Sequence, residues 1–286
     1  MMKIVHSFGV GTEWANDFAK QLGGELNGSF MELPESVFKG VSYVLNIHSA
    51  MSAWFLEGTY QQAVHFSIRH LTDDFISIVY NMSEGGAIRI LNKEKQQVGR
   101  WNYNFSIMDS SLMNDYIVDE GTYAYTVAIF IHKEYILSFF KSVPALQEVL
   151  KSFYDTRKNT FIRLGRTSNQ AWWVLQELKK QDVYGPGFDF FLTGSVWLLL
   201  AECIDDAKNR EPVIAHVSAD NLSRIIASQE TLVNNVDKTF PGINVLAAEA
   251  YMSATKYKTL FKKITGLSAN TFFLNNKLEV AKEMLE

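Results

Sequence analysis

The sequence predicts an α+β protein: an N-terminal antiparallel β sandwich or barrel, then a helical segment, then a partial all-α module. Three observations predict this order. Short apolar runs with period-two alternation dominate residues 1–140. Apolar residues at helical spacing dominate residues 141–217. Residues 218–286 contain short helical patterns separated by tight turns. We therefore expect three units with these boundaries.

The strands of the first unit are short and rich in β-branched and aromatic residues, with turn-like separators between them. They include "HFSIRHL" (65–71), "DFISIVY" (74–80), "AIRIL" (87–91) and "TYAYTVAIFIH" (122–132). The last run places one set of alternate residues on a single face: Tyr123, Tyr125, Val127, Ile129 and Ile131. An earlier amphipathic piece, residues 13–24, predicts one helix that ends at glycine. Many short strands at this spacing are typical of a sandwich or barrel.

Helical periodicity begins after Pro144, with apolar residues over 146–153. A second helix is expected over 168–181, with Ser168 or Asn169 as its N-cap. A third, over 188–209, is apolar nearly all round in the middle. Such a helix needs burial on more than one side, and a second copy of the chain can supply the other side. We therefore expect a homodimer through this segment.

Composition narrows the class of protein. The net charge of −4 argues against a wholly basic, nucleic-acid-coating surface but allows one basic module. The longest apolar run, "VWLLLA" (196–201), is far short of the roughly 20 residues of a membrane span, so no membrane partner is expected. The N-terminus lacks the apolar core of a signal peptide. A single cysteine, Cys203, excludes an internal disulfide framework, and we expect a cytoplasmic protein.

Residues 251–278 hold five lysines and no acidic residue. Within them Tyr257, Leu260, Phe261 and Ile264 form one apolar helical stripe, with Ser253 as a candidate cap. The other face carries Thr255, Lys256, Lys258, Thr259, Lys262 and Lys263. A short alanine-rich helix, 243–252, precedes it. Two short helices joined by a tight turn form a helix-turn-helix, whose second helix fits the DNA major groove. The competing interpretation is a solvated, lysine-rich helix face.

Residues 246–285 resemble the first helix-turn-helix of AraC/XylS-type transcriptional regulators. The resemblance rests on the pair Leu246–Ala247, on Ala250, on the turn Met252–Ser253, on "LFKKITGLS" (260–268) and on Phe273. It implies a cytoplasmic regulator that binds operator DNA and senses a small-molecule effector through its N-terminal domain. It also implies base-facing positions at Thr255, Lys258 and Thr259, and positions near phosphates at Ser253 and Lys262.

The sequence departs from that family in two ways. Arginine or glutamine is frequent in the family where Lys258 and Thr259 stand here, so the bases that these residues would read stay open. The family's DNA-binding region has two helix-turn-helix units, and this sequence stops within the match to the helix that connects them. We therefore expect a partial DNA-binding domain that binds operator DNA weakly. Truncation and natural fragment remain open alternatives.

The first unit offers candidates for an effector site. Aromatic residues on predicted strands, and one arginine among apolar neighbours, could line an apolar pocket with a polar contact. They are Trp54, Arg69, Trp101, Tyr103, Tyr123 and Tyr125. The competing interpretation makes the aromatic residues ordinary core and Arg69 a solvated side chain.

An alternative function is a cupin-like metal-dependent enzyme with a helical tail. The expected H-x-H motif, with a later carboxylate and histidine, is missing. His65 and His70 are five residues apart and would face opposite sides of one strand. We find no catalytic motif of the phosphate-loop, nucleophile-elbow or zinc-protease kind. The expectation is therefore no metal, no cofactor and no enzyme activity.

Overall fold

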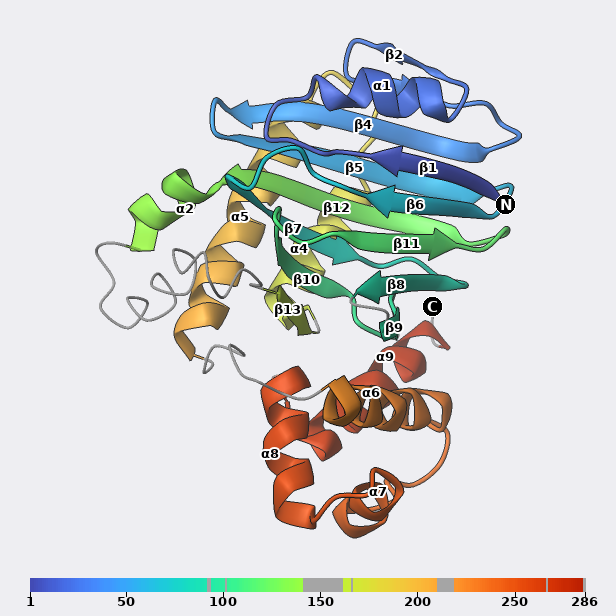
Figure 1. Ribbon diagram of the computed structural model, residues 1–286, viewed down its shortest axis with the longest axis vertical. Coiled ribbons are helices and arrows are strands. Elements are labelled where there is room, and N and C mark those ends of the chain that lie inside the picture. The colour runs from blue at the N-terminus through green and yellow to red at the C-terminus, as the bar shows by residue number, and fades with distance from the viewer. Residues whose placement is uncertain are drawn as a thin grey trace.

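The computed structural model describes residues 1–91, 94–100, 102–140, 162–165, 167–209, 219–265 and 267–284. Two stacked β-sheets form the larger part, with helices on the outside and a separate group of helices below (Figure 1). One sheet has five strands in the order β1-β6-β11-β8-β9, and the other has eight in the order β13-β10-β7-β12-β5-β4-β3-β2. The predicted α+β fold with an antiparallel sandwich is confirmed, although β1 pairs with β6 in parallel.

The strands and helices have the following bounds. The five-stranded sheet consists of β1 (Met2–His6), β6 (Val64–Ile68), β8 (Ala87–Leu91), β9 (Glu94–Gln97) and β11 (Asn114–Val118). The eight-stranded sheet consists of β2 (Glu25–Asn27), β3 (Phe30–Glu32), β4 (Phe38–His48), β5 (Met51–Tyr60), β7 (Phe75–Asn81), β10 (Phe105–Asp109), β12 (Tyr123–His132) and β13 (Ile162–Gly165). The helices are α1 (Trp14–Gln21), α2 (Lys133–Phe140), α4 (Asn169–Lys179), α5 (Phe188–Asn209), α6 (Ala219–Asn234), α7 (Ile243–Glu249), α8 (Ala254–Thr265) and α9 (Ala269–Glu283).

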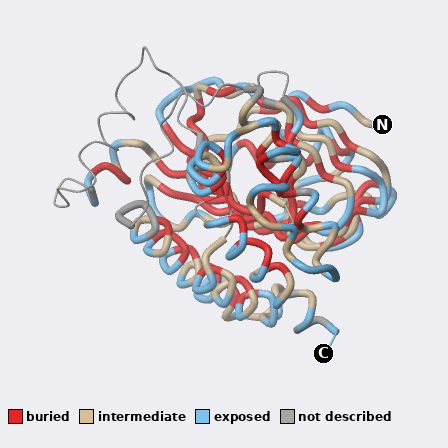
Figure 2. The backbone as a smooth tube through the Cα atoms, turned by 90° about the horizontal axis from the view of Figure 1, so that it is seen from below, coloured by how far each residue is buried: buried red, intermediate tan, exposed pale blue. Residues whose placement is uncertain are grey.

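Two apolar cores lie on the two faces of the eight-stranded sheet. The inner core fills the space between the sheets and under α1, with Phe18, Phe66 and Phe130 among its members. The outer core lies between the same sheet and helices α4 and α5, with Leu175 and Leu199 among its members. Figure 2 shows buried backbone concentrated where these layers meet and exposed backbone on the outer turns of the helices. Burial on both faces explains why β7 and β12 are apolar almost throughout.

Local expectations from the sequence are met at several elements. Helix α1 ends where Gly23 adopts a φ of 81°, as the glycine predicted. Helix α4 begins with Ser168, whose hydroxyl accepts a hydrogen bond from Ala171 N at 3.1 Å. The predicted apolar face of β12 is the face toward α4 and α5, where Tyr125 and Ile129 are buried.

One difference concerns the segment predicted to be helical. Strand β13 lies within it and joins the edge of the eight-stranded sheet beside β10. The helix expected over 146–153 lies outside the described residues. Helix α5 has the predicted bounds, and the sheet of the same chain covers one of its sides, where Leu199 is fully buried. Tyr80 also donates a hydrogen bond to the carbonyl of Leu199 at 2.9 Å.

Helices α6 to α9 pack together around a core that also includes residues of the sandwich. Its buried residues include Ile225 and Leu232 of α6, which share a cluster with Ala87 and Val98 from the sheet. Gln229 of α6 donates a hydrogen bond to the hydroxyl of Tyr103 at 3.2 Å. Across the described residues, none of the helices has the length and apolar character to cross a bilayer.

Candidate functional site

The turn between α7 and α8 is built from backbone hydrogen bonds that close a helix C-terminus. Met252 N bonds to the carbonyl of Ala247 at 2.8 Å, and Tyr251 N to that of Ala248 at 3.0 Å. This pair of bonds is a Schellman motif, and Tyr251 takes the left-handed conformation that it requires, with φ 53°. Arg224 of α6 donates to the carbonyl of Ala250 at 3.3 Å. The turn is therefore fixed to the rest of the unit.

One face of α8 is locked into the core of this unit. Tyr257 and Phe261 are fully buried, and their rings lie 5.5 Å apart between centroids. The ring of Phe261 also meets Phe272 of α9 edge-on at 5.6 Å. The Tyr257 hydroxyl and Ser228 of α6 share a 2.6 Å hydrogen bond. These contacts set the rotation of α8, and so determine which residues face outward.

The outward face of α8 carries the residues that the sequence assigned to DNA. Thr255, Lys258, Thr259 and Lys262 are spaced at i, i+3, i+4 and i+7, and all four are exposed. Lys256 is exposed beside them, while the side chain of Lys263 lies outside the described residues. Ser253 is exposed, and its hydroxyl accepts from Lys256 N at 3.3 Å as the helix cap. At 12 residues, α8 is about 18 Å long.

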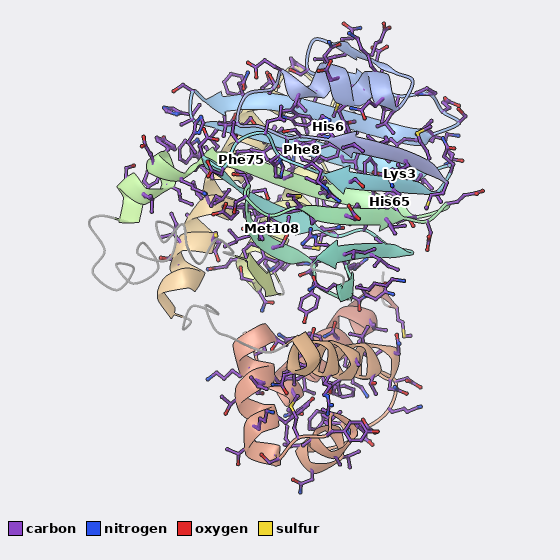
Figure 3. All side chains as sticks on the ribbon, in the orientation of Figure 1. Lys3, His6, Phe8, His65, Phe75 and Met108 are labelled. Atoms are coloured by element: carbon purple, nitrogen blue, oxygen red, sulfur yellow. The ribbon has the colours of Figure 1, made fainter. Side chains whose placement is uncertain are left out.

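A cavity of about 90 Å³ lies between the two sheets. At roughly 10–15 Å³ per water-sized probe, it has room for a molecule of several heavy atoms. Aromatic side chains surround one part of it: Phe8, Phe18, Trp54, Tyr60, Phe66 and Phe130. Phe8 stacks on Phe130 at 5.1 Å, and Phe18 stacks on Phe66 at 5.7 Å. In Figure 3, Phe8 and Met108, both of which line the cavity, lie in the layer of the two sheets.

Polar side chains line another part of the cavity: Asn81, Ser83, Arg89, Asn114 and Tyr116. Asn81 Nδ2 donates to the hydroxyl of Tyr116 at 2.9 Å, and Asn81 Oδ1 accepts from Ser83 N at 3.0 Å. Burial raises the pKa of Tyr116, so its hydroxyl stays protonated at neutral pH. Asn114 Oδ1 and Ser83 Oγ are buried without a hydrogen-bond partner. The site thus has unused hydrogen-bonding groups beside an apolar space.

The residues predicted for an effector site are dispersed. Trp54 lines the cavity, and its indole nitrogen donates to Ser42 at 2.9 Å. Tyr123 and Tyr125 belong to the opposite face of the eight-stranded sheet, where Tyr123 donates to Glu57 at 2.6 Å and Tyr125 to the carbonyl of Leu175 at 2.5 Å. Tyr103 contacts α6. Trp101 lies outside the described residues.

Arg69 also lies away from the cavity lining. Its guanidinium forms a 2.8 Å ion pair with Asp115 and donates to two backbone carbonyls, so its charge has a partner. The hydrogen bond from Arg69 holds the pKa of the Asp115 carboxyl below its usual value, against the opposing effect of burial. The role of Arg69 in this structure is to join the end of β6 to β11.

Sequence reasoning missed Arg89, the charged residue of the cavity. In "AIRIL" it stands between two isoleucines, a pattern that normally points the isoleucines inward and the arginine outward. The structure has the reverse: Arg89 is 5% exposed, and Ile88 and Ile90 are half-buried on the other face. The signal that was missed is which alternate residues of the paired strands face into the sandwich, because this decides the inward face of β8.

Two of the described histidines lie beside an acidic side chain. His65 lies 3.5 Å from Asp115, and His132 lies 3.3 Å from Asp74. Among the side chains that the structure describes, no three of His, Cys, Asp and Glu gather where they could hold one metal ion.

Comparisons with known proteins gave matches among solved structures. No family model matches the chain. No curated protein matches it either. The crystal structure of the AraC-like transcriptional activator CuxR is 9% identical, with 87% of this chain and 85% of that chain covered and a TM-score of 0.37.

Two structures of ToxT from Vibrio cholerae also match. One is 12% identical, with 79% of this chain and 98% of that chain covered and a TM-score of 0.33. The other is bound to (E)-4-(8-methylnaphthalen-1-yl)but-3-enoic acid and is 10% identical, with 80% of this chain and all of that chain covered and a TM-score of 0.29.

Proposed function

We propose that this protein is a DNA-binding transcriptional regulator of the AraC type, with α8 as the recognition helix and the β sandwich as the sensor of a small molecule. The observation that carries the proposal is the outward stripe of α8. Thr255, Lys258, Thr259 and Lys262 share one exposed face of a helix whose opposite face is anchored by Tyr257 and Phe261. The resemblance of residues 246–285 to the family's first helix-turn-helix supports the same assignment.

The chemistry of this stripe fits a duplex. Lysines neutralise phosphates and donate to guanine in the major groove, and threonines contact base edges and thymine methyl groups. The block from residue 251 to 278 has no acidic residue that would repel the backbone of DNA, although the whole chain has a net charge of −4. An ordinary solvated helix would carry charges of both signs. The segregation of charge therefore favours DNA over a merely solvated face.

The proposal is tested with single lysine substitutions and a duplex selected from random DNA by the 286-residue chain. Lys258→Ala should cost roughly 1–3 kcal/mol on the selected duplex and relax preference at one base pair, because a base contact is lost. Lys262→Ala should weaken all duplexes alike and lower the salt slope by about 0.9, because a phosphate contact is lost. Titrations on selected and scrambled duplexes at several salt concentrations measure both effects.

The matched control is Lys39→Ala, which removes an exposed lysine of β4, far along the chain from α8. It should bind both duplexes like the unchanged protein. If Lys258→Ala leaves the ratio of the affinities for the selected and the scrambled duplex unchanged, α8 is not the recognition helix. If Lys262→Ala matches Lys39→Ala, the phosphate role is wrong.

We also propose that α5 forms the interface of a homodimer. Its sheet-facing side is buried within one chain, but its outer side is apolar as well: Phe190 is 81% exposed and Leu198 57% exposed. Trp197, 37% exposed, belongs to the same side and meets the ring of Phe139 at 6.4 Å. Residues 190, 194, 197 and 201 follow the four-three spacing of a helix seam. A second α5 would cover this stripe and remove it from water.

Leu198→Glu should convert the dimer to a monomer, because it places a charge beside Trp197 on the exposed apolar side of α5 while leaving the sheet-facing side unchanged. Sedimentation over a range of concentrations measures the change. Leu71→Glu introduces the same substitution at a side chain that is 89% exposed in a loop, and should leave the assembly unaltered. A wild-type chain that stays monomeric at high micromolar concentration would refute the interface. Leu199, fully buried against the sheet, is unsuitable for this test.

A further inference from the structure

A row of buried side chains crosses the five-stranded sheet and points into the sandwich. Backbone pairing places Ile4, Phe66, Tyr116, Arg89 and Gln96 side by side on β1, β6, β11, β8 and β9. Directly paired residues project from the same face of a sheet. All five lie on the inner face, and Arg89 is the one with a formal charge. The row therefore brings one cation to the wall of the cavity.

Arg89 has no counter-charge among the described residues. Its Nε is buried without a hydrogen-bond partner. Burial lowers the pKa of Arg89 to about 10, with the neighbouring Tyr116 as a smaller opposing influence. The guanidinium is therefore still charged at neutral pH. A buried cation without a partner is costly, since the lost hydration is not replaced.

The nearest polar groups do not supply the missing charge. Gln96 lies across from Arg89 on β9, and its Oε1 is also buried without a partner. An amide oxygen can accept an N–H hydrogen bond but carries no formal negative charge. Asp115 is adjacent to Tyr116 in sequence, so it projects from the opposite face, where it pairs with Arg69. Within the part of the chain that the structure describes, no acidic side chain supplies the missing charge, and a bound anionic ligand would supply it.

The other residues that line the cavity indicate the chemical nature of the rest of the ligand. The donors and acceptors of Ser83, Tyr116 and Asn114 lie at the polar part. The aromatic wall is apolar, with Phe8, Phe18, Trp54, Phe66 and Phe130. An inorganic anion would leave that wall facing empty or wet space. A small molecule with an acidic head and an apolar body would use both parts of the cavity.

We propose that the cavity binds a small organic carboxylate, with the carboxylate on Arg89 and an apolar body of several heavy atoms among the aromatic side chains. A guanidinium and a carboxylate match in geometry through two parallel N–H···O bonds. The volume of about 90 Å³ suits a short-chain or single-ring acid. The inference rests on the proposed sensing role of the sandwich and names the class of molecule that it senses.

The test is calorimetric titration of the 286-residue chain with benzoate and hexanoate, each compared with its primary amide and with inorganic phosphate. We expect binding of at least one carboxylate, and binding of its amide weaker by about 10- to 100-fold, because the charged contact with Arg89 is lost. Phosphate should not bind measurably. No DNA is present, so a negative result here is separate from failure of the DNA-binding proposal.

Variants at two arginines locate the site. Arg89→Met should abolish the preference for carboxylate over amide, and without ligand it should raise the melting temperature, because a buried unpaired charge is replaced by an apolar side chain. Arg89→Lys keeps the charge and should keep part of the preference. Arg69→Met removes an arginine that is already paired outside the cavity, and should bind like the unchanged protein.

Three outcomes would overturn the inference. One is equal affinity for an acid and its amide. Another is binding of phosphate as tight as that of the organic acids. The third is a folded Arg89→Met protein that still prefers the carboxylate over the amide. In each case the negative group, the apolar body or Arg89 itself would have been assigned wrongly.

Discussion

Phe261→Ala should lower the free energy of unfolding of helices α6–α9 by about 3–5 kcal/mol. This is the cost typical of removing a buried phenyl ring and leaving a cavity. Phe261 is fully buried and contacts both Tyr257 and Phe272, so neighbouring side chains cannot easily fill the space. Loss of this anchor would also free α8 to rotate. We expect DNA affinity to fall with stability, even though no outward residue is changed.

The two parts of the chain can be followed separately in one denaturation experiment. All six tryptophans lie between residues 14 and 197, so their fluorescence reports the sandwich with α4 and α5. Helical circular dichroism also reports α6–α9. Phe261→Ala should shift the dichroism transition to lower denaturant and leave the fluorescence transition in place. Leu278→Ala, at a side chain that is 67% exposed on α9, is the control and should cost under about 0.5 kcal/mol.

Equal effects of Phe261→Ala and Leu278→Ala would show that α8 is not held by this core. A joint shift of both transitions would show that the sandwich and the helical unit unfold together. The 3.2 Å bond between Gln229 and Tyr103 and the cluster around Ala87 would then couple them more strongly than their few contacts suggest.

The helical part of the fold was the more predictable, because its signals are local. Ser168 caps α4, and the stripe of Tyr257 and Phe261 gives the buried face of α8, both as the sequence indicates. The limits of α5 were also predictable. Its environment was not, since an apolar helix has the same pattern whether a sheet or a second subunit covers it.

The sandwich was predictable in class but not in detail. The alternation of β12 specifies two faces, but not which face meets the cavity. Tyr123 and Tyr125 proved to lie on the helix side of the sheet. Strand β13 is short and pairs with the distant β10, a contact that no local pattern records. Register across strands is set by pairing partners far apart in sequence.

Arg89 shows the same limit at the candidate ligand site. Its local pattern predicts an outward side chain, and the pairing of β8 with β11 reverses this. Such conflicts between local pattern and global fold gather at functional positions. Strand β8 also begins at Ala87, which packs in the cluster of α6. The residue that we assign to a ligand and the residue that meets helix α6 thus lie two positions apart on one strand.

The second large effect expected is acid destabilisation of the sandwich through His6. The side chain of His6 is 6% exposed, and its Nε2 is buried without a partner among the rings of Phe8, Trp14 and Phe18. Burial lowers the pKa of His6 to about 4, with nearby His70 adding to the decrease and Asp17 opposing it. In the unfolded chain the imidazole titrates near pH 6.5.

Between pH 6.5 and about 4, the unfolded state therefore binds a proton that the folded state excludes. The free energy of unfolding must fall as pH falls through this window, by up to about 3 kcal/mol from His6. His6→Leu should flatten this part of the profile, because no proton is taken up at that position. Denaturation followed by tryptophan fluorescence, at intervals from pH 7 to pH 4, measures it.

His48→Leu provides the comparison, since it removes an exposed imidazole from the end of β4. It should retain the wild-type loss of stability on acidification. Burial also lowers the pKa of His70, so a smaller slope should persist in His6→Leu. If His6→Leu loses as much stability as the wild type between pH 6.5 and 4, the buried imidazole is not the group that takes up the proton. The acid sensitivity would then belong to other groups of the sandwich, His70 first.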